Sequence, residues 1–290
     1  MYIGIDLGGS HIGFGLLDES FKLIKKEKVL ITRQTEVEQI IYLLKEGIQK
    51  FFDKSVRYIG IGFPGICDIK KRIVTRASNI NFSSICIPEI LEKEFNVPVY
   101  LDNDANCATI AEYFKGNLQG INNGVLITVG TGIGGGIILN KELYRGSNYT
   151  AGEFGHTTFV KDGITCGCGK KGCFEKYASI SSLKKKCLQK GYNFEICEEI
   201  FNSSDKDVIK IKNEWMNNLA EGISNIYNIL DIEKIVVGGG FSKSFYLIEK
   251  DLRNLVKEKI YNKNKEIIIQ KAMLENSAGI IGAGMLGSIK

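Results

Sequence analysis

Hydrophobic and polar positions follow two periods along the first third of the chain. Short apolar runs separated by turn residues predict three strands in the first 33 residues, YIGIDL, IGFGLLD and KLIKKEKVLI. Apolar residues at helical spacing from Val37 to Phe51 then predict a helix. Two further strands, RYIGIGF and VPVYLD, precede the helical segment NDANCATIAEYF. This part of the chain is therefore expected to form an α/β domain.

The same pattern restarts near residue 120. The segment GVLITVGTGIGGGIILNKELYRG again predicts a strand, a glycine-rich turn and a strand. A shift of 122 residues lays LGGSHIGFGLLD over VGTGIGGGIILN, with Gly8 on Gly130 and Gly13 on Gly135. Two explanations remain open: an internal duplication, or two hairpins that use the same turn residues independently.

The remainder of the chain continues the alternation of helices and strands. A long helix is predicted around Trp215 to Leu230, followed by the strand KIVVGGG, a helix, the strand EIIIQKAML and a short helix after Ser277. The chain has only three prolines among 290 residues, and no Pro-rich linker divides it. Two packed α/β domains are expected, residues 1–116 with 277–290 and residues 117–276, joined by a hinge.

Composition narrows the class of protein. Hydrophobic residues make up 44% and charged residues 24%, as in an ordinary globular protein, and the net charge of +5 is spread over scattered lysines. A solvated surface, with no nucleic-acid partner, is therefore expected. The sequence lacks a signal peptide and a membrane-length apolar run, so a cytoplasmic protein without a membrane partner is expected. Eight cysteines should then stay reduced, and their clustering favours a metal site over disulfides.

Three G-x-G-x-x-G motifs occur, beginning at Gly60, Gly130 and Gly282. None of them opens a helix after a strand, which a dinucleotide site requires, and no P-loop motif is present. Two glycine turns facing each other, with Asp6 beside the first, would hold a polyphosphate by backbone amides. Tight hairpins also need glycine for their own sake. For the pair of turns together, phosphate binding is the preferred interpretation.

These segments resemble the ROK family of repressors, open reading frames and kinases, within the hexokinase–actin superfamily. IDLGGSHIGFGLLD and VGTGIGGGIILNKELYRG resemble its two phosphate turns, VVGGG its adenosine-side turn, and DNDANCATIAE its catalytic aspartate segment. The most specific match is AGEFGH followed, after nine residues, by CGCGKKGCFE, which is similar to the family's sugar-and-zinc signature. The resemblance implies a two-domain actin/hexokinase-like (ribonuclease H-like) α/β fold with the active site in the inter-domain cleft.

The resemblance also implies an activity and a set of residues. The expected reaction transfers the γ-phosphate of ATP, with Mg²⁺, to the 6-hydroxyl of a hexose or N-acetylhexosamine. Asp104 is selected as general base, although from the residues alone Asp102 and Asp104 are both candidates and either could cap the following helix. The substrate-binding residues implied are Gly65, Asn103, Glu153, His156 and Glu175. The nucleotide-binding residues implied are Asp6, Gly8, Gly9, Ser10, Thr131, Gly132 and Gly239, with Asp6 helping to hold Mg²⁺ through water.

The cysteine cluster is expected to bind a structural Zn²⁺. The four ligands implied are His156, Cys166, Cys168 and Cys173. Three thiolates and one imidazole complete a tetrahedral shell and leave no water on the metal. Gly167, Gly169 and Gly172 are expected to permit the sharp backbone path between the ligands. His156 would ligate with one ring nitrogen and present the other to the sugar. Three ordinary buried cysteines are the alternative, and the other five cysteines are assigned no chemistry.

Other functions and details remain open at this stage. The family includes sugar-sensing repressors with an N-terminal DNA-binding domain, but the first phosphate turn begins at Asp6 and leaves no room for one, so a kinase is expected. A catalytically inactive sugar-sensing regulator is the alternative. Relatives are commonly dimers, so a homodimer is expected.

The identity of the sugar is also open. Glucose and N-acetylmannosamine are the leading candidates, followed by N-acetylglucosamine and fructose. Asn79 and Asn81 are possible partners for an acetamido group or simple turn residues. His11 stands where many relatives carry lysine. No role is assigned to it: it could contact phosphate, but an exposed turn histidine is the preferred interpretation.

Overall fold

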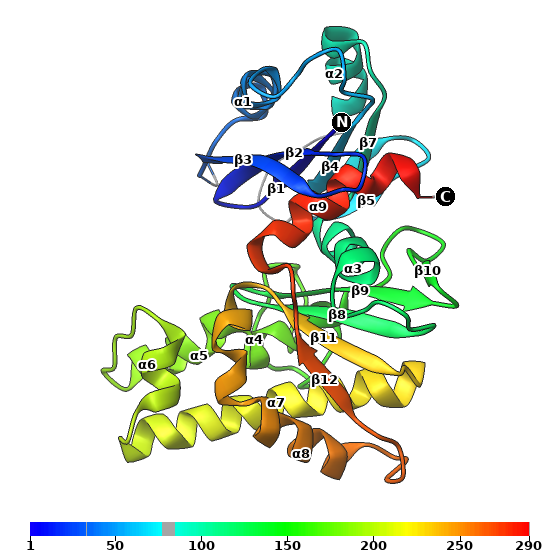
Figure 1. Cartoon of the computed structure of the whole chain (residues 1–290). Helices are drawn as coiled ribbons and strands as arrows, with labels where there is room; N and C mark the ends of the chain where they lie inside the picture. Colours follow the sequence, from blue (N-terminus) through cyan, green and yellow to red (C-terminus); the bar gives the residue numbers. More distant parts are fainter. Residues whose placement is uncertain (33, 77–84, 290) are drawn as a thin grey trace. The chain divides into compact units, whose positions relative to one another are not determined.

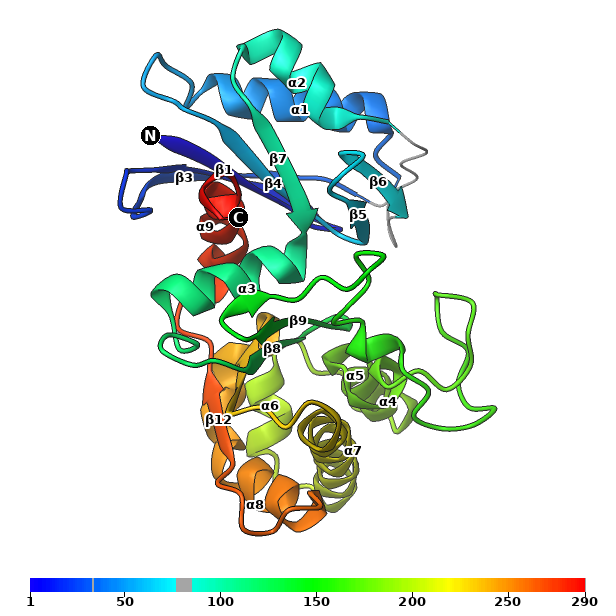
Figure 2. The ribbon, with the colours of Figure 1, turned by 90° about the vertical axis from the view of Figure 1, so that its right-hand side faces the viewer.

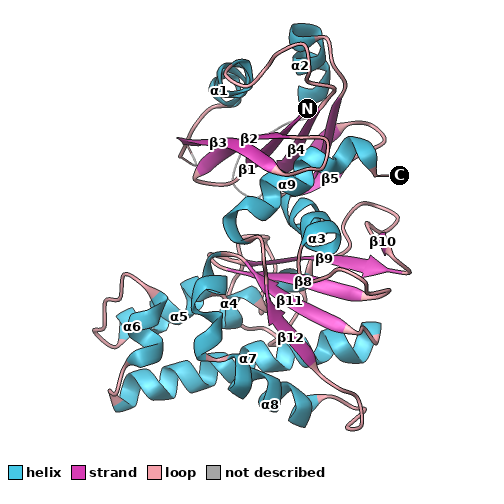
Figure 3. Ribbon diagram, in the orientation of Figure 1, coloured by secondary structure: helices cyan, strands magenta, loops and turns pink. Residues whose placement is uncertain are grey.

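The computed structural model describes residues 1–32, 34–76 and 85–289, and the chain divides into two compact units. Unit 1 comprises Met1–Lys115, Leu143–Ala151 and Asn276–Lys290, and unit 2 comprises Gly116–Glu142 and Gly152–Glu275. The segment Leu143–Ala151, expected from the sequence to lie in the second domain, belongs with unit 1. Each unit combines a five-stranded sheet with helices (Figure 3).

Unit 1 is built on a sheet with the strand order β3-β2-β1-β4-β7 (Figure 1). Strand β1 pairs antiparallel with β2 and parallel with β4, which in turn is parallel to β7. The elements are β1 (Tyr2–Leu7), β2 (His11–Leu17), β3 (Leu23–Leu30), α1 (Val37–Gln49), β4 (Ile59–Phe63), the small hairpin β5 (Ile66–Asp68) and β6 (Ile73–Arg76), α2 (Ile87–Phe95), β7 (Val99–Asn103), α3 (Asp104–Lys115) and α9 (Ala278–Met285), the last flanked by short 3₁₀ turns at Glu275–Ser277 and Leu286–Ser288.

The two faces of this sheet are packed by different kinds of residue. Successive side chains of a strand point to opposite faces, so alternate isoleucines of β1 and β4 enter one core, together with α1 and α2. Figure 2 shows α1 and α2 on that side of the sheet and α9 on the other. On the α9 side the strands carry glycine: a Cβ on Gly4 would lie 2.0 Å from Ile280 O, and one on Gly60 1.8 Å from Ala283 O. Glycine is required there because helix and sheet backbones touch.

Unit 2 is built on a sheet with the strand order β10-β9-β8-β11-β12. The long helix α7 runs beside α4, α5 and α8, which pack against it (Figure 1). The elements are β8 (Gly124–Val129), β9 (Ile133–Leu139), β10 (Glu142–Leu143), η1 (Phe154–His156), α4 (Glu175–Ala178), α5 (Ile180–Gln189), α6 (Cys197–Asn202), α7 (Lys206–Leu230), β11 (Lys234–Gly238), η2 (Gly240–Leu247), α8 (Glu249–Lys259) and β12 (Ile268–Lys271).

The two sheets repeat one topology, which favours internal duplication. Strands β1 and β2, shifted by 122 residues, coincide with β8 and β9 at both ends, and β11 and β12 extend the second sheet in parallel as β4 and β7 extend the first. The pairing differs at the turns, however: four residues separate the last paired residues Leu7 and Ile12, whereas three separate Val129 and Ile133. Gly13 pairs with Asp6, whereas Gly135 pairs with Ile127, not with the equivalent position 128. A one-residue change of register reverses the face presented, so these two aligned glycines are not spatially equivalent.

The sequence pattern predicted the long elements and missed the short ones. Helix α2, strands β5 and β6 and helices α4 to α6 were not assigned from the sequence, and each of these helices and strands has ten residues or fewer. Such segments hold too few turns for a periodic signal. Within the ranges described, no helix has both the length and the apolar character needed to cross a membrane.

Candidate functional site

The aspartate proposed as general base lies at the junction of β7 and α3. Asp104 is the first residue of α3, directly after the carboxyl end of a parallel strand, and its side chain is partly exposed. Its Oδ1 accepts a hydrogen bond from the backbone N–H of Ala105 at 2.8 Å. Functional side chains of open α/β sheets gather at this edge.

Its neighbour Asp102 is committed to the protein itself. Asp102 is 2% exposed, and its Oδ2 accepts from Arg145 Nε at 2.7 Å. Its Oδ1 accepts from the backbone N–H of Asn103 at 2.7 Å and from Asn106 Nδ2 at 2.9 Å. Of the two aspartates left open by the sequence, Asp102 is thus buried and Asp104 is partly exposed.

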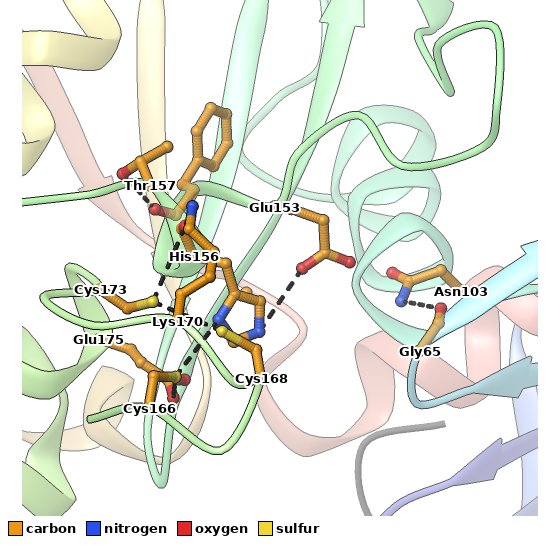
Figure 4. A network of polar contacts seen from close by, with 12 residues as sticks. Gly65, Asn103, Glu153, His156, Thr157, Cys166, Cys168, Lys170, Cys173 and Glu175 are labelled. Atoms are coloured by element: carbon orange, nitrogen blue, oxygen red, sulfur yellow. Dashed lines mark hydrogen bonds and ion pairs between the residues drawn. The ribbon is translucent and has the colours of Figure 1, made fainter. Parts of the chain in front are cut away.

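The helix cap is neither aspartate, contrary to the alternative raised from the sequence. Asn103 Oδ1 accepts from the backbone N–H groups of Ala105 at 2.9 Å and Asn106 at 3.1 Å, which is the N-cap arrangement of α3. Asn103 Nδ2 donates to Gly65 O at 2.9 Å (Figure 4). Gly65, whose φ of 118° favours glycine, is thereby fastened to the end of β7.

Asp6, expected near the first phosphate turn, lies near the end of β1 on the glycine-bearing face. A Cβ on Gly279 would lie 2.6 Å from Asp6 Cγ, so the carboxyl group abuts the first turn of α9. Burial raises the pKa of Asp6 from its ordinary 3.8 to about 6. Strong desolvation of one carboxylate in this position is typical of functional groups.

The first turn, Gly8 to Ser10, is closed by its own backbone. Gly8 N–H donates to His11 O at 2.8 Å, and Ser10 Oγ lies 3.2 Å from His11 Nδ1. His11 is partly buried, not an exposed turn residue. Burial, with a contribution from Lys28, lowers its pKa below the ordinary value, so the imidazole is neutral at pH 7.

The second turn closes in the same way in unit 2. Gly130 N–H donates to Gly132 O at 3.0 Å, and Thr131 is exposed at the tip. The backbone of Gly239, after β11, arches over the end of β8: with φ of 78°, a Cβ there would lie 2.7 Å from Val129 O. The unit-2 residues expected to bind nucleotide thus gather at one edge of this sheet.

The four expected zinc ligands converge in unit 2 (Figure 4). One ligand atom from each of them lies within 4.8 Å of all the others. Cys168 Sγ and Cys173 Sγ are 3.5 Å apart, and Cys166 Sγ is 3.7 Å from His156 Nδ1. Burial raises the pKa of Cys166 to about 12.

The loop that carries the cysteines is shaped by two glycines, not three. Gly169 and Gly172 have φ of 91° and 75°, and a Cβ on Gly172 would meet Val160 O at 1.6 Å. Gly167 has no such conformation and its added Cβ would meet nothing within 4 Å, so the expectation for Gly167 was wrong. Lys170 Nζ donates to His156 O at 2.8 Å and ties the loop to the histidine.

His156 presents its two ring nitrogens in opposite roles. Nδ1 faces the cysteines, while Nε2 is 3.9 Å from Glu153 Oε2 (Figure 4). The segment that carries both residues lies directly on β9: a Cβ on Gly155 would be 2.1 Å from Ile133 O, and one on Gly135 would be 2.5 Å from the Phe154 ring. Gly135 of β9 and Gly155 of η1 therefore allow this segment to lie directly against the strand.

Glu175 joins the cysteine loop to the second glycine turn. Its Oε1 accepts from Cys166 Sγ at 3.2 Å, and its Oε2 is 2.7 Å from the position that a Cβ on Gly132 would take. The side chain is only 17% exposed. Two segments assigned to different ligands by the sequence, the sugar loop and a phosphate turn, therefore meet at one carboxylate.

Sequence reasoning missed Arg145, whose guanidinium neutralises Asp102. An arginine before a glycine in a turn carries no signal of its own, and the partner lies 43 residues earlier. Asn79 and Asn81, raised as partners for an acetamido group, lie outside the described residues.

Two α/β units with repeated sheets, glycine hairpins and an aspartate at a strand end define an actin/hexokinase-like fold. The chain is similar to a ROK family glucokinase from Streptomyces griseus in complex with glucose and AMPPNP, with a TM-score of 0.86, 29% identity and 98% of each chain covered. A family model described as ROK family matches residues 2–288. The protein belongs to the ROK family.

The relatives to which the chain is similar include sugar kinases and a repressor. A glucokinase from Halalkalibacterium halodurans is 30% identical over 98% of this chain and 94% of its own length, and an N-acetyl-D-glucosamine kinase from Photobacterium profundum is 28% identical over 99% of both. A xylose repressor from Caldicellulosiruptor bescii is 29% identical over 97% of this chain and 76% of its own length.

Proposed function

We propose that this protein is an ATP-dependent sugar kinase that phosphorylates the 6-hydroxyl of a hexose or N-acetylhexosamine. The observation that carries the proposal is the state of the two aspartates at the end of β7. Asp102 is buried and bound by three donors, whereas Asp104 is partly exposed at the sheet edge where ligands bind. Similarity to kinases over almost the whole chain supports the same assignment.

In this proposal Asp104 orients the sugar hydroxyl and takes its proton as phosphate transfer proceeds. Phosphoryl transfer needs little covalent chemistry from the protein, which mainly positions the reactants and neutralises charge. The base is held in place because Asn103 caps α3 and because Asp104 Oδ1 accepts from Ala105 N–H. These bonds restrict the orientation of the Asp104 carboxylate.

We assign nucleotide binding to the two glycine turns and the turn at Gly239. Their backbone N–H groups are suited to phosphate oxygens because no Cβ obstructs the approach. Asp6 would hold Mg²⁺ through water, and Mg²⁺ would supply positive charge to the phosphates. A carboxyl group with a pKa of about 6 fits this role, since a nearby cation would favour its ionised form.

We assign a structural Zn²⁺ to His156 and the three cysteines of the loop. The donor set fits: sulfur–sulfur and sulfur–nitrogen separations of 3.5 and 3.7 Å suit ligands about 2.0–2.3 Å from one tetrahedral ion. Four protein ligands close the shell, so the ion would fix the loop and take no part in the chemistry. With Nδ1 so engaged, His156 Nε2–H can donate to a sugar hydroxyl, and the carboxylates of Glu153 and Glu175 can accept from sugar hydroxyls.

The test is a panel of sugars with ATP and Mg²⁺, ranked by kcat/KM. Glucose and N-acetylmannosamine are expected at the top, followed by N-acetylglucosamine and fructose, with the phosphate on carbon 6 by NMR of the product. A hydrogen-bonded site discriminates strongly because mismatched polar groups are left unpaired. Sugar binding without turnover of any sugar in the panel would contradict the kinase proposal. It would favour a sugar-sensing regulator, the class suggested by the similarity to a xylose repressor.

A further inference from the structure

A nearly buried ion pair involves Asp102, two residues before the proposed base. Arg145 Nε donates to Asp102 Oδ2 at 2.7 Å, with side-chain exposures of 20% and 2%. Asp102 in turn receives the backbone N–H of Asn103 and the Nδ2 of Asn106 on its other oxygen. One guanidinium therefore neutralises the carboxylate that binds both the last residue of β7, Asn103, and the first turn of α3 at Asn106.

Arg145 lies in a short segment of unit 1 that is inserted, in sequence, between two segments of unit 2. Residues Leu143–Ala151 belong to unit 1, although the residues on both sides belong to unit 2. The segment forms a closed loop, because Ala151 N–H donates to Arg145 O at 3.1 Å and Gly146 turns the chain with φ of 74°. Arg145 stands at the base of this loop and points its side chain into the β7–α3 junction.

We propose that Arg145 is a positioning residue: by binding Asp102 it fixes Asn103 and Asp104 in the geometry needed for phosphate transfer. The proposal rests on the proposed kinase function. Asn103 links the pair to the site directly, since its N–H binds Asp102 and its side chain both caps α3 and holds Gly65. A change at Asp102 is therefore transmitted to the residue before the base and to the helix on which the base stands.

Loss of Arg145 alone is expected to be costly for a specific reason. Removing one partner of a buried pair leaves an uncompensated charge, whereas removing both charges can be almost neutral. Without the guanidinium, the Asp102 carboxylate would turn toward water, and this change would loosen its bonds to Asn103 and Asn106. The start of α3 would then sample several orientations, and small errors in alignment slow a transfer step greatly.

The experiment compares Arg145→Met with the double variant Asp102→Asn/Arg145→Met. Arg145→Met is expected to lower kcat by about 10–100-fold with little change in the dissociation constants for sugar and ATP. The double variant is expected to recover most of that loss, because the introduced amide keeps an acceptor for Asn103 and Asn106 and carries no charge. The matched control is Arg57→Met, which removes an arginine from the exposed pair with Glu19 and should leave kcat unchanged.

A second readout does not depend on activity. Amide hydrogen exchange at Asn103, Ala105 and Asn106 is expected to accelerate in Arg145→Met and to return toward the original rate in the double variant. If the unaltered protein phosphorylated no sugar, the proposed function would fail, and the exchange pattern would still decide the role of Arg145. Unchanged kcat and unchanged exchange in Arg145→Met would overturn the inference. So would a double variant no better than the single one. Arg145→Lys keeps the charge and covers the case in which Arg145→Met is too unstable to measure; a fully active Arg145→Lys would show that charge alone suffices.

Discussion

The residues around Asp104 in unit 1 and those around His156 in unit 2 are held by different means. In unit 1 the protein supplies every tie itself: an ion pair to Asp102, a capped helix start and a bond from Asn103 to Gly65. In unit 2 the tie at the centre is a cluster of four potential ligands whose atoms all lie within 4.8 Å of one another. Three thiols and an imidazole form only weak hydrogen bonds with one another, so we propose that a bound metal ion holds these four side chains together.

We therefore expect the two groups of residues to differ in their sensitivity. The residues around Asp104 should be insensitive to chelators and sensitive to single changes in their hydrogen-bond network. The residues around His156 should lose their order when the proposed zinc is removed, while unit 2 keeps its hydrophobic core. Four expected outcomes sharpen or break this comparison, in order of decreasing effect.

The largest effect is expected for Asp104→Asn. Loss of a general base costs about 10²–10⁴-fold in rate. Asparagine keeps an acceptor for the Ala105 N–H, so the helix start should survive and the sugar and nucleotide should still bind. A coupled kinase assay gives kcat, and calorimetry gives the two affinities. Near-full turnover in Asp104→Asn would remove this residue from the chemistry.

The next largest effect is expected when one of the four proposed zinc ligands is replaced. Cys168→Ser should reduce bound zinc from one ion per chain toward none, and weaken sugar binding by roughly 10–100-fold, because His156 loses its fixed orientation. ATP binding should change much less. The matched control is Cys197→Ser, a partly buried cysteine outside the cluster. Elemental analysis and sugar titrations decide it. A metal-free preparation with undiminished sugar affinity would break the contrast between the units.

A smaller effect is expected at the contact between Gly132 and Glu175. In Gly132→Ala the new methyl group would lie 2.7 Å from Glu175 Oε2 and push this flexible carboxylate aside, with little loss of stability. Sugar affinity measured without nucleotide should fall about tenfold, the value of one charged hydrogen bond. Gly130→Ala is the control, because its nearest neighbour, Gly240 N, would be 3.6 Å away. Equal sugar affinities in the two variants would mean that Glu175 does not contact the sugar.

The smallest effect, and one of opposite sign, is expected for the stability of Asp6→Asn without nucleotide or Mg²⁺. The pKa of Asp6 is raised to about 6 by burial, so the folded state holds a proton that the unfolded chain has already released above pH 3.8. Stability is therefore lost as pH rises from about 4 to 6, and above pH 6 the buried charge remains a cost. Asp6→Asn should raise Tm by a few degrees at pH 7 and by nothing below pH 4.

The control for this last outcome is Asp53→Asn. Asp53 is exposed, and the Ser55 hydroxyl lowers its pKa, so its substitution should not raise Tm at pH 7. Thermal melts at pH 4, 5, 6, 7 and 8 would separate the two carboxyl groups. A flat difference between Asp6→Asn and the unaltered protein across this range would contradict the burial argument.

Much of the fold was predictable because its long strands and helices have strong periods. The β1–β2 and β8–β9 hairpins and α7 appear where the apolar pattern placed them. The convergence of His156 with the three cysteines was also predictable, because the three clustered cysteines and the histidine suit a tetrahedral metal site and resemble the family's signature. The pairing of Arg145 with Asp102 was not, because it depends on which unit the 143–151 segment joins, a property of tertiary packing.

Register is the second feature that the pattern could not supply. The match of Gly13 with Gly135 was correct in sequence, yet the two residues pair with different neighbours because the second turn is one residue shorter. Hydrophobic alternation gives the face of a strand only when the strand alternates. Strand β9 reads IGGGIIL, in which three consecutive glycines leave no such signal.

The helix that covers the glycine-bearing face of the first sheet comes from the C-terminal end of the chain, so unit 1 cannot be completed until the end of synthesis. Strands β1, β2 and β4 emerge from the ribosome early, but the helix that lies against Gly4 and Gly60 is α9, made from residues 278–285. Residues Gly152–Glu275 of unit 2 are translated before that helix exists. The unit that contains the first residue of the protein is therefore the last to be finished, and a released chain truncated before residue 278 should have a unit 2 that resists protease and a unit 1 that does not.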